Sequence, residues 1–348
     1  MPLPPIDTHF LLDFLTRLLN TPSPTGYAQA AVALTEETLG AFSELRLSRN
    51  RKGALLAEWP GEAETTPRAL TAHVDTLGAM VKEIKPNGRL KLTQIGGYAW
   101  NAIEGEGVRV FASGGEVIRG SVLLTMASSH VFGKLVNETK RDEDTLEVRL
   151  DARAANPDET RALGIETGDF VALDPRVEVT NGFVRSRHLD DKACVACIAA
   201  AVKALHDAGL KPRQRTHLLI SNYEEVGHGA ATGFPPDLAE LLCVDMAAVG
   251  DGQTSDEFHA TLCVKDSGGP YHYGFSQTLR RLADEQGIPY KVDIYPYYGS
   301  DGEAYWRAGG DVAVALIGPG VDASHNYERT HTEALIATTQ WILAYLLS

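Results

Sequence analysis

The sequence lacks any run of about 20 consecutive apolar residues, the length that a membrane-spanning helix requires. Residues 1–7 are rich in proline and contain no basic region followed by an apolar segment, so they do not resemble a signal peptide. We therefore expect a cytoplasmic protein that does not act in a membrane.

Basic residues and cysteines are also scarce. The chain has 32 Lys and Arg against 46 Asp and Glu, which gives a net charge of -14. This balance argues against nucleic acid as a partner, because phosphate binding needs a basic surface. Of the 4 cysteines only Cys194 and Cys197 are closely spaced, and no second pair completes a zinc ribbon. Their Ala-rich segment predicts a buried helix, so we interpret both as core residues.

What is present is an α/β pattern interrupted by a β-rich segment. The predicted helices are residues 10–19, 27–42, 191–208, 272–286 and 332–346. Continuous apolar runs at 216–221, 241–244 and 312–317 are typical of parallel strands that are covered on both faces. Short strands separated by turn signals recur between about residues 76 and 180. The sequence thus predicts a discontinuous α/β domain of residues 1–76 and 181–348, with an inserted, mostly β domain of residues 77–180.

Titratable side chains follow several of the predicted strands. His73 and Asp75 follow strand 68–72, and a histidine that binds metal usually gives its other ring nitrogen to a carboxylate. Glu224 and Glu225 follow strand 216–221, where two adjacent buried carboxylates are costly unless a cation neutralises them or they point apart. Neighbouring side chains at a strand end diverge, so one can bind metal while the other faces a bound water. This division predicts a metal-assisted hydrolase.

Three further positions complete the pattern. Asp245 ends strand 241–244, and Asp190 lies just before a helix, where it could be an N-cap or a carboxylate that bridges two cations. The loop after strand 312–317 offers His325 and His331, either of which could be a ligand. Because ligand sites in open α/β sheets gather at the carboxyl ends of strands, we expect these groups to meet. Histidine with carboxylates suits zinc or another first-row divalent ion, and a shared carboxylate suits two ions.

These motifs together resemble those of a known enzyme family. The segments are Ala72-His-Val-Asp-Thr-Leu-Gly78, Leu189-Asp-Asp-Lys192, Glu224-Glu-Val-Gly227, the isolated Asp245 and Ser324-His325. In order and spacing they are similar to the tetrahedral (TET) aminopeptidases, dinuclear zinc metallopeptidases that include glutamyl and deblocking aminopeptidases. The similarity spans nearly the whole chain. It implies an α/β fold with a mixed sheet sandwiched by helices, and an inserted β domain that serves for dimerisation.

The resemblance also implies a role for each residue. His73 and Asp245 would bind one metal, Glu225 and His325 the other, and Asp190 would bridge them. Glu224 would take a proton from the metal-bridging water, and Asp75 would orient His73. The Asp190–Asp191 peptide is often cis in such enzymes. The Ser-His match favours His325 as the last ligand, with His331 as the alternative.

The expected enzyme is thus an aminopeptidase that acts on short peptides with two divalent ions per chain. Zinc is favoured, with cobalt or manganese as alternatives. A homo-oligomer is expected, built from dimers into a tetrahedral dodecamer. Two departures from the family pattern are the helix start Lys192-Ala-Cys194 and the segment from His325 to His331, which resembles a bacterial sub-branch. That sub-branch can be linked to osmoprotectant peptides.

Two other hypotheses stay open. The same centre could act as a deacylase or deblocking hydrolase on N-acyl amino acids or modified peptides. A protein without activity, kept as an assembly or binding module, is the third possibility. Retention of all five candidate ligands and of Glu224 argues against it, because such a protein has no chemical reason to keep an unpaired buried carboxylate.

Overall fold

The structure is a computed structural model that describes residues 2–348, and the chain forms two compact units. The first unit comprises the described residues up to Asp75 together with Arg176–Ser348, and the second is Thr76–Pro175. No helix among the described residues is long and apolar enough to cross a membrane.

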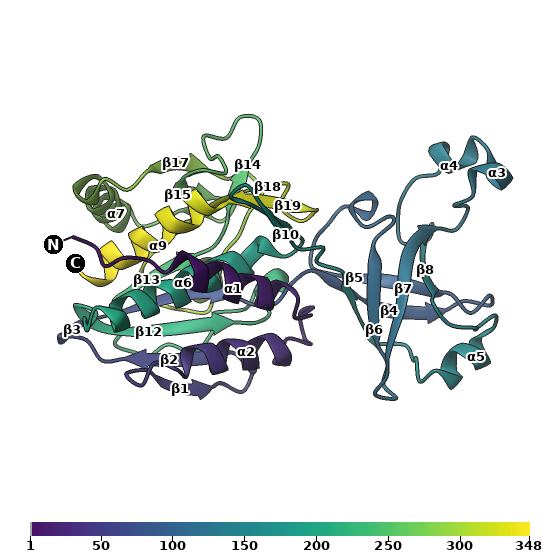
Figure 1. Cartoon of the computed structure of the whole chain (residues 1–348), viewed down its shortest axis with the longest axis horizontal. Coiled ribbons are helices and arrows are strands. Elements are labelled where there is room, and N and C mark those ends of the chain that lie inside the picture. Colours follow the sequence, from purple (N-terminus) through teal and green to yellow (C-terminus); the bar gives the residue numbers. More distant parts are fainter. Residues whose placement is uncertain (1) are drawn as a thin grey trace. The chain divides into compact units, whose positions relative to one another are not determined.

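The first unit is built on a mixed sheet (Figure 1). Its main strands, in spatial order, are β1 (Arg46–Arg49), β2 (Leu55–Trp59), β12 (Gln214–Ser221), β3 (Ala63–His73), β13 (Glu240–Val244), β18 (Ala313–Asp322), β19 (Glu328–His331), β11 (Phe183–Ser186) and β10 (Glu178–Thr180). The strands β14 (Ala247–Val249), β15 (Ala260–Asp266), β16 (Gly269–Pro270) and β17 (Tyr290–Ile294) pair outside this path. The central neighbours β12, β3, β13 and β18 are all parallel, so their carboxyl ends lie at one edge of the sheet.

Helices cover both faces of this sheet. They are α1 (Thr8–Leu19), α2 (Gln29–Leu39), α6 (Leu189–Asp207), α7 (Tyr273–Gln286), α8 (Asp301–Arg307) and α9 (Thr332–Leu346). Alternate residues of β13 enter two different cores, since Leu242 and Val244 pack with α6 and α9 while Leu241 and Cys243 face the α8 side. Complete burial of a large aliphatic side chain contributes about 1.5–3 kcal/mol, so burial on both faces explains why these strands read as continuous apolar runs. The predicted mixed sheet sandwiched by helices is confirmed.

Helix α6 lies at the centre of the larger core. Small residues dominate it, which lets α1 and α9 pack closely against it (Figure 1). Cys194 and Cys197 are buried there as free thiols, as the sequence predicted. The sequence allowed Asp190 to be either an N-cap or a bridging carboxylate. At the start of α6 both Asp190 and Asp191 have non-helical dihedral angles, so the regular helix begins after them. The peptide bond between the two aspartates is cis.

The second unit is a closed β-barrel. Its strands, in order around the barrel, are β4 (Gly78–Ile84), β5 (Leu90–Ile95), β8 (Leu146–Leu150), β7 (Val117–Leu124), β6 (Gly107–Phe111) and β9 (Phe170–Leu173). The short helices are α3 (Ser129–Phe132), α4 (Leu135–Glu138) and α5 (Pro157–Ala162). Inward-facing valines such as Val108, Val122 and Val148 are fully buried and fill the barrel. The predicted mostly-β segment is therefore a small barrel with its own core.

Candidate active site

The candidate residues gather at the carboxyl ends of the central parallel strands. His73 ends β3 and pairs in register with Ser221 at the end of β12. Glu224 and Glu225 follow β12 in a short 3-10 turn, and Asp245 directly follows β13. Because the neighbouring strands run parallel, their carboxyl ends lie at one edge of the sheet. The side chains at or just after these ends therefore meet there, as the sequence predicted.

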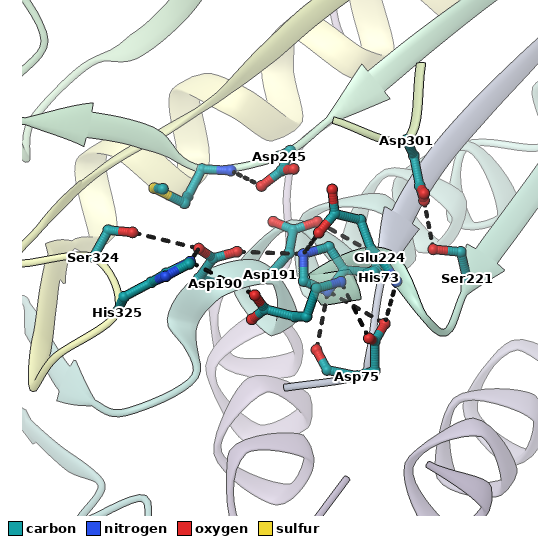
Figure 2. Close-up of polar contacts among 12 residues, drawn as sticks. His73, Asp75, Asp190, Asp191, Ser221, Glu224, Asp245, Asp301, Ser324 and His325 are labelled. Atoms are coloured by element: carbon teal, nitrogen blue, oxygen red, sulfur yellow. Dashed lines mark hydrogen bonds and ion pairs between the residues drawn. The ribbon is translucent and has the colours of Figure 1, made fainter. Parts of the chain in front are cut away.

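Asp190 lies between the two histidines of the site (Figure 2). One carboxylate oxygen is 3.3 Å from Nε2 of His73, and the other is 3.3 Å from Nε2 of His325. Two groups of potential ligands share this aspartate: His73, Asp190 and Asp245 form one, and Asp190, Glu225 and His325 form the other. Within each group the potential ligand atoms lie within 4.8 Å of one another. The carboxylate of Asp190 is thus placed to serve both groups.

Several observations fit these groups to divalent cations. The buried Nε2 of His73 faces the Asp190 carboxylate at 3.3 Å but makes no hydrogen bond of regular geometry among the described residues. Burial, together with the nearby charge of Asp190, raises the pKa of Glu225 to about 8 and that of Asp245 to about 7. Carboxylates held so close together away from water keep protons unless a positive charge replaces them. Imidazole and carboxylate donors suit zinc, cobalt or manganese.

Glu224 belongs to neither group but lies beside the first. Its Oε2 atom is 3.6 Å from Nε2 of His73. Burial raises the pKa of Glu224 well above its usual range, and Asp245 adds to the rise while His73 opposes it. A carboxylate with a raised pKa that faces a cavity has the properties of a general acid–base group.

A cavity of about 570 Å³ opens onto these side chains. Asp190, Glu224, Glu225, Asp245 and His325 line its floor, and the rest of its lining is Gly227, Met246, Ala248, Tyr297, Tyr298, Gly299, Ser300, Arg307 and Ser324. The volume lies in the range of small-molecule sites, which are clefts of roughly 300–1,000 Å³. The arrangement therefore joins two groups of potential metal ligands to space for a small molecule.

Asp75 contacts more of the site than the sequence predicted. Its backbone carbonyl lies 2.9 Å from Nδ1 of His73, while its carboxylate is 3.6 Å from the same nitrogen. The carboxylate also accepts hydrogen bonds from the backbone N–H groups of Glu224 at 3.2 Å and Glu225 at 3.4 Å, and from the hydroxyl of Thr25 at 2.6 Å. Asp75 therefore links the His73 strand end to the glutamate pair.

The two histidines of the last loop occupy different environments. His331 is the N-cap of α9, where Nδ1 accepts a hydrogen bond from Glu333 N at 3.2 Å, and its ring packs against Phe183 and Phe258. His325 instead faces Asp190 and lies 3.6 Å from the Glu225 carboxylate. Of the two alternatives, only His325 is in one of the potential ligand groups of the described chain.

Sequence reasoning missed two buried carboxylates near the site. Asp301 lies in a Gly-Ser-Asp-Gly segment that is typical of a turn, but it begins α8 and accepts a hydrogen bond from Ser221 (Figure 2). It also accepts hydrogen bonds from Thr71 and from the backbone N–H of Ala230. Glu328 accepts hydrogen bonds from the backbone of Asp190 and His325. The sequence could not indicate either role. The hydrogen-bond partners of these carboxylates are residues distant along the chain or backbone N–H groups, which leave no pattern of residue types.

Comparison with known proteins decides the family. The model of the M42 glutamyl aminopeptidases matches residues 53–341. The chain belongs to the M42 glutamyl aminopeptidase family. An M42 member is a hydrolase of the aminopeptidase class, as the sequence predicted.

Relatives of this M42 protein match nearly its full length. YhfE of Bacillus subtilis (strain 168), described as a candidate aminopeptidase, is 45% identical over 97% of both chains. An aminopeptidase from the archaeon Desulfurococcus kamchatkensis has a similar fold, with a TM-score of 0.87 at 20% identity over 97% of this chain and 95% of that one. The Pyrococcus horikoshii TET1 peptidase, which can assemble into a tetrahedron or a large octahedral shell, gives a TM-score of 0.84 at 20% identity over 97% and 99%. The predicted TET resemblance is thus confirmed at the level of family and fold.

Proposed function

We propose that this protein is a metal-dependent aminopeptidase that removes N-terminal residues from short peptides. The observation that carries the proposal is the pair of potential ligand groups that share Asp190 on the floor of one cavity. His73 and Asp245 would hold one divalent ion, Glu225 and His325 the other, and Asp190 both. Zinc is favoured, with cobalt or manganese as alternatives. When bound, two such ions polarise a carbonyl group and lower the pKa of water.

Glu224 is the residue of this chain that would move protons. Its carboxylate lies beside the ligand groups but outside them, so it would accept a proton from the attacking water and deliver it to the leaving amine. A peptide amine is a poor leaving group unless it is protonated, which is why a retained proton on Glu224 matters. Asp75 would hold Glu224 in place through the backbone and would orient His73 through Nδ1.

The proposal is tested by the choice of substrate. Aminoacyl-p-nitroanilides and N-acyl amino acids should be assayed in parallel on protein loaded with Zn²⁺ or Co²⁺. We expect turnover of the aminoacyl compounds. Turnover of the acylated compounds alone would instead identify a deacylase or deblocking hydrolase that uses the same residues. A folded protein that binds no metal would contradict both enzyme hypotheses and favour a binding module.

Replacing His325 and His331 separately should distinguish their roles. The H325A variant should lose most of the affinity for one metal ion, because it removes an imidazole from the second ligand group. The H331A variant should retain both ions and lose about 1 kcal/mol of stability, because it removes a helix cap. Metal content per chain measures the loss of the ion, and thermal unfolding measures the loss of stability, in both variants. Loss of metal from H331A with retention in H325A would reverse the assignment.

The stability of metal-free protein should fall as the pH rises from about 4 to about 8. The folded protein keeps protons on Glu225 and Asp245, whose pKa values are about 8 and about 7, whereas the unfolded chain releases them near about pH 4. A raised folded-state pKa stabilises the fold at low pH, and that contribution is lost as the pH passes the raised value. Cations compete with these protons, so the gain in Tm on adding Zn²⁺ should increase over the same range. A gain independent of pH would contradict this.

We also propose that the protein is a homo-oligomer built from dimers through the residue 76–175 unit. The support is the fold similarity to the Pyrococcus horikoshii TET1 peptidase and the exposure of apolar Val131 and Leu135 on α3 and α4. Light scattering after size-exclusion chromatography should give a mass near twelve times that of the 37.6 kDa chain for a tetrahedral dodecamer. A monomer under all conditions would reject the oligomer.

A further inference from the structure

Glu328 connects two segments that carry residues of the site. It begins β19 and is only 2% exposed. One oxygen of its carboxylate accepts a hydrogen bond from the backbone N–H of His325 at 3.1 Å, and the other accepts one from the backbone N–H of Asp190 at 3.2 Å. Asp190 is 138 residues from Glu328 along the chain, so this side chain joins the start of α6 to the loop after β18.

The backbone at both segments needs such support. His325 has a φ of 64°, in the left-handed region that a residue with a Cβ atom rarely occupies, and His188, two residues before Asp190, has a φ of 74°. Conformations of this kind are unfavourable for residues with a Cβ atom and persist where surrounding contacts hold them. The hydrogen bonds from Glu328 fix the amides of His325 and Asp190, and therefore the direction in which both side chains leave the backbone.

The other side of the site shows the same construction. The carboxylate of Asp75 accepts the backbone N–H groups of Glu224 and Glu225, and the carboxylate of Asp191 accepts that of His73 at 3.2 Å. His73, Asp190, Glu225 and His325 each donate a backbone N–H to a buried carboxylate, which for His325 is only three residues away along the chain. Glu328 accepts the backbone N–H groups of two members of the Asp190, Glu225 and His325 group, and Asp75 accepts that of the third.

We propose that Glu328 is a positioning residue that sets the metal affinity of the Asp190, Glu225 and His325 group by holding the backbone of Asp190 and His325. This inference rests on the proposed dinuclear site. Residues that orient metal ligands typically change metal affinity by about 10–100-fold when they are replaced. A carboxylate is required because both of its oxygens accept, whereas glutamine would turn an N–H donor toward one of the two amides.

The test compares E328Q with a matched control. The E257Q variant replaces a buried carboxylate that bonds Arg329, the residue after Glu328, at 2.7 and 2.8 Å. Metal-free wild type, E328Q and E257Q are titrated calorimetrically with Zn²⁺. We expect E328Q to bind zinc about 10–100-fold more weakly at the group that also contains His325, with a smaller loss at the other group because both share Asp190, and E257Q to match wild type. Activity of E328Q should recover in excess Zn²⁺.

Amide hydrogen exchange on the metal-free proteins gives a second readout. The amides of Asp190 and His325 should be protected in wild type and should exchange faster in E328Q, with no change in E257Q. If E328Q does not fold, E328D can replace it, since aspartate keeps the charge with a shorter side chain. Exchange in wild type alone also tests the proposal, because unprotected amides at Asp190 and His325 would overturn it. If wild type binds two ions and E328Q binds them with the same affinity, the positioning role of Glu328 is rejected and the dinuclear site is not. Wild type that binds none rejects the dinuclear site itself.

Discussion

The E224Q variant is expected to lose about 10²–10⁴-fold in kcat while it keeps its bound metal. Glutamine has the shape of glutamate but cannot accept a proton, and Glu224 lies outside both potential ligand groups. Steady-state kinetics on an aminoacyl-p-nitroanilide, with metal analysis of the same sample, measure both quantities. Because Glu224 is buried beside other carboxylates that raise its pKa, the neutral variant should be at least as stable as wild type.

The adjacent E225Q variant is the matched control for this experiment. The two glutamates are neighbours in one turn and have the same side chain, but only Glu225 belongs to a potential ligand group. E225Q should therefore lose metal affinity, and its activity should depend on the metal concentration. Full activity in E224Q would remove the proton-transfer role from Glu224, and metal loss in E224Q would make it a ligand.

The D190A variant is expected to lose affinity for both ions and at least about 10³-fold in activity. Asp190 directs one carboxylate oxygen toward each histidine, so its replacement by alanine removes a potential ligand from both groups. Stabilisation of the transition state by metal is worth several kcal/mol, and each 1.36 kcal/mol is a factor of ten in rate. Metal content per chain should fall from about two toward zero, and excess metal should restore little activity.

A variant of a different buried aspartate checks that this effect is specific. Asp293 is 7% exposed and accepts hydrogen bonds from Thr254 and Ser255, away from the ligand groups. D293A should lower the Tm without changing the metal content. If D190A retains one ion with its wild-type affinity, Asp190 serves one group and does not bridge two.

Much of the site could be predicted because its residues follow strands with simple patterns. Buried parallel strands read as apolar runs, and the polar residue after each run lies at the same sheet edge, which places His73, Glu224, Glu225 and Asp245. The choice between His325 and His331 could not be made from spacing, because both lie in one loop. It depends on where β19 pairs with β11 and on the capping of α9 by His331.

The supporting carboxylates could not be predicted for a related reason. Asp75 was expected only beside His73, and Glu328 had no assigned role, because both act on backbone N–H groups that carry no sequence signature. Asp190 was predicted as either an N-cap or a bridging group, and the local sequence suits both. In the structure the Asp190 segment has non-helical dihedral angles, and a different oxygen of the side chain lies 3.3 Å from Nε2 of each histidine.

The clustering of strand ends at one edge of the sheet also determines when the site can exist during protein synthesis. Its side chains come from positions between His73 and His325 of a 348-residue chain, with the whole barrel unit made in between. A nascent chain on the ribosome therefore holds no complete set of candidate ligands until the loop after β18, which carries His325, has been made. A fragment that ends before His325 should therefore lack one of the candidate ligands of the second group.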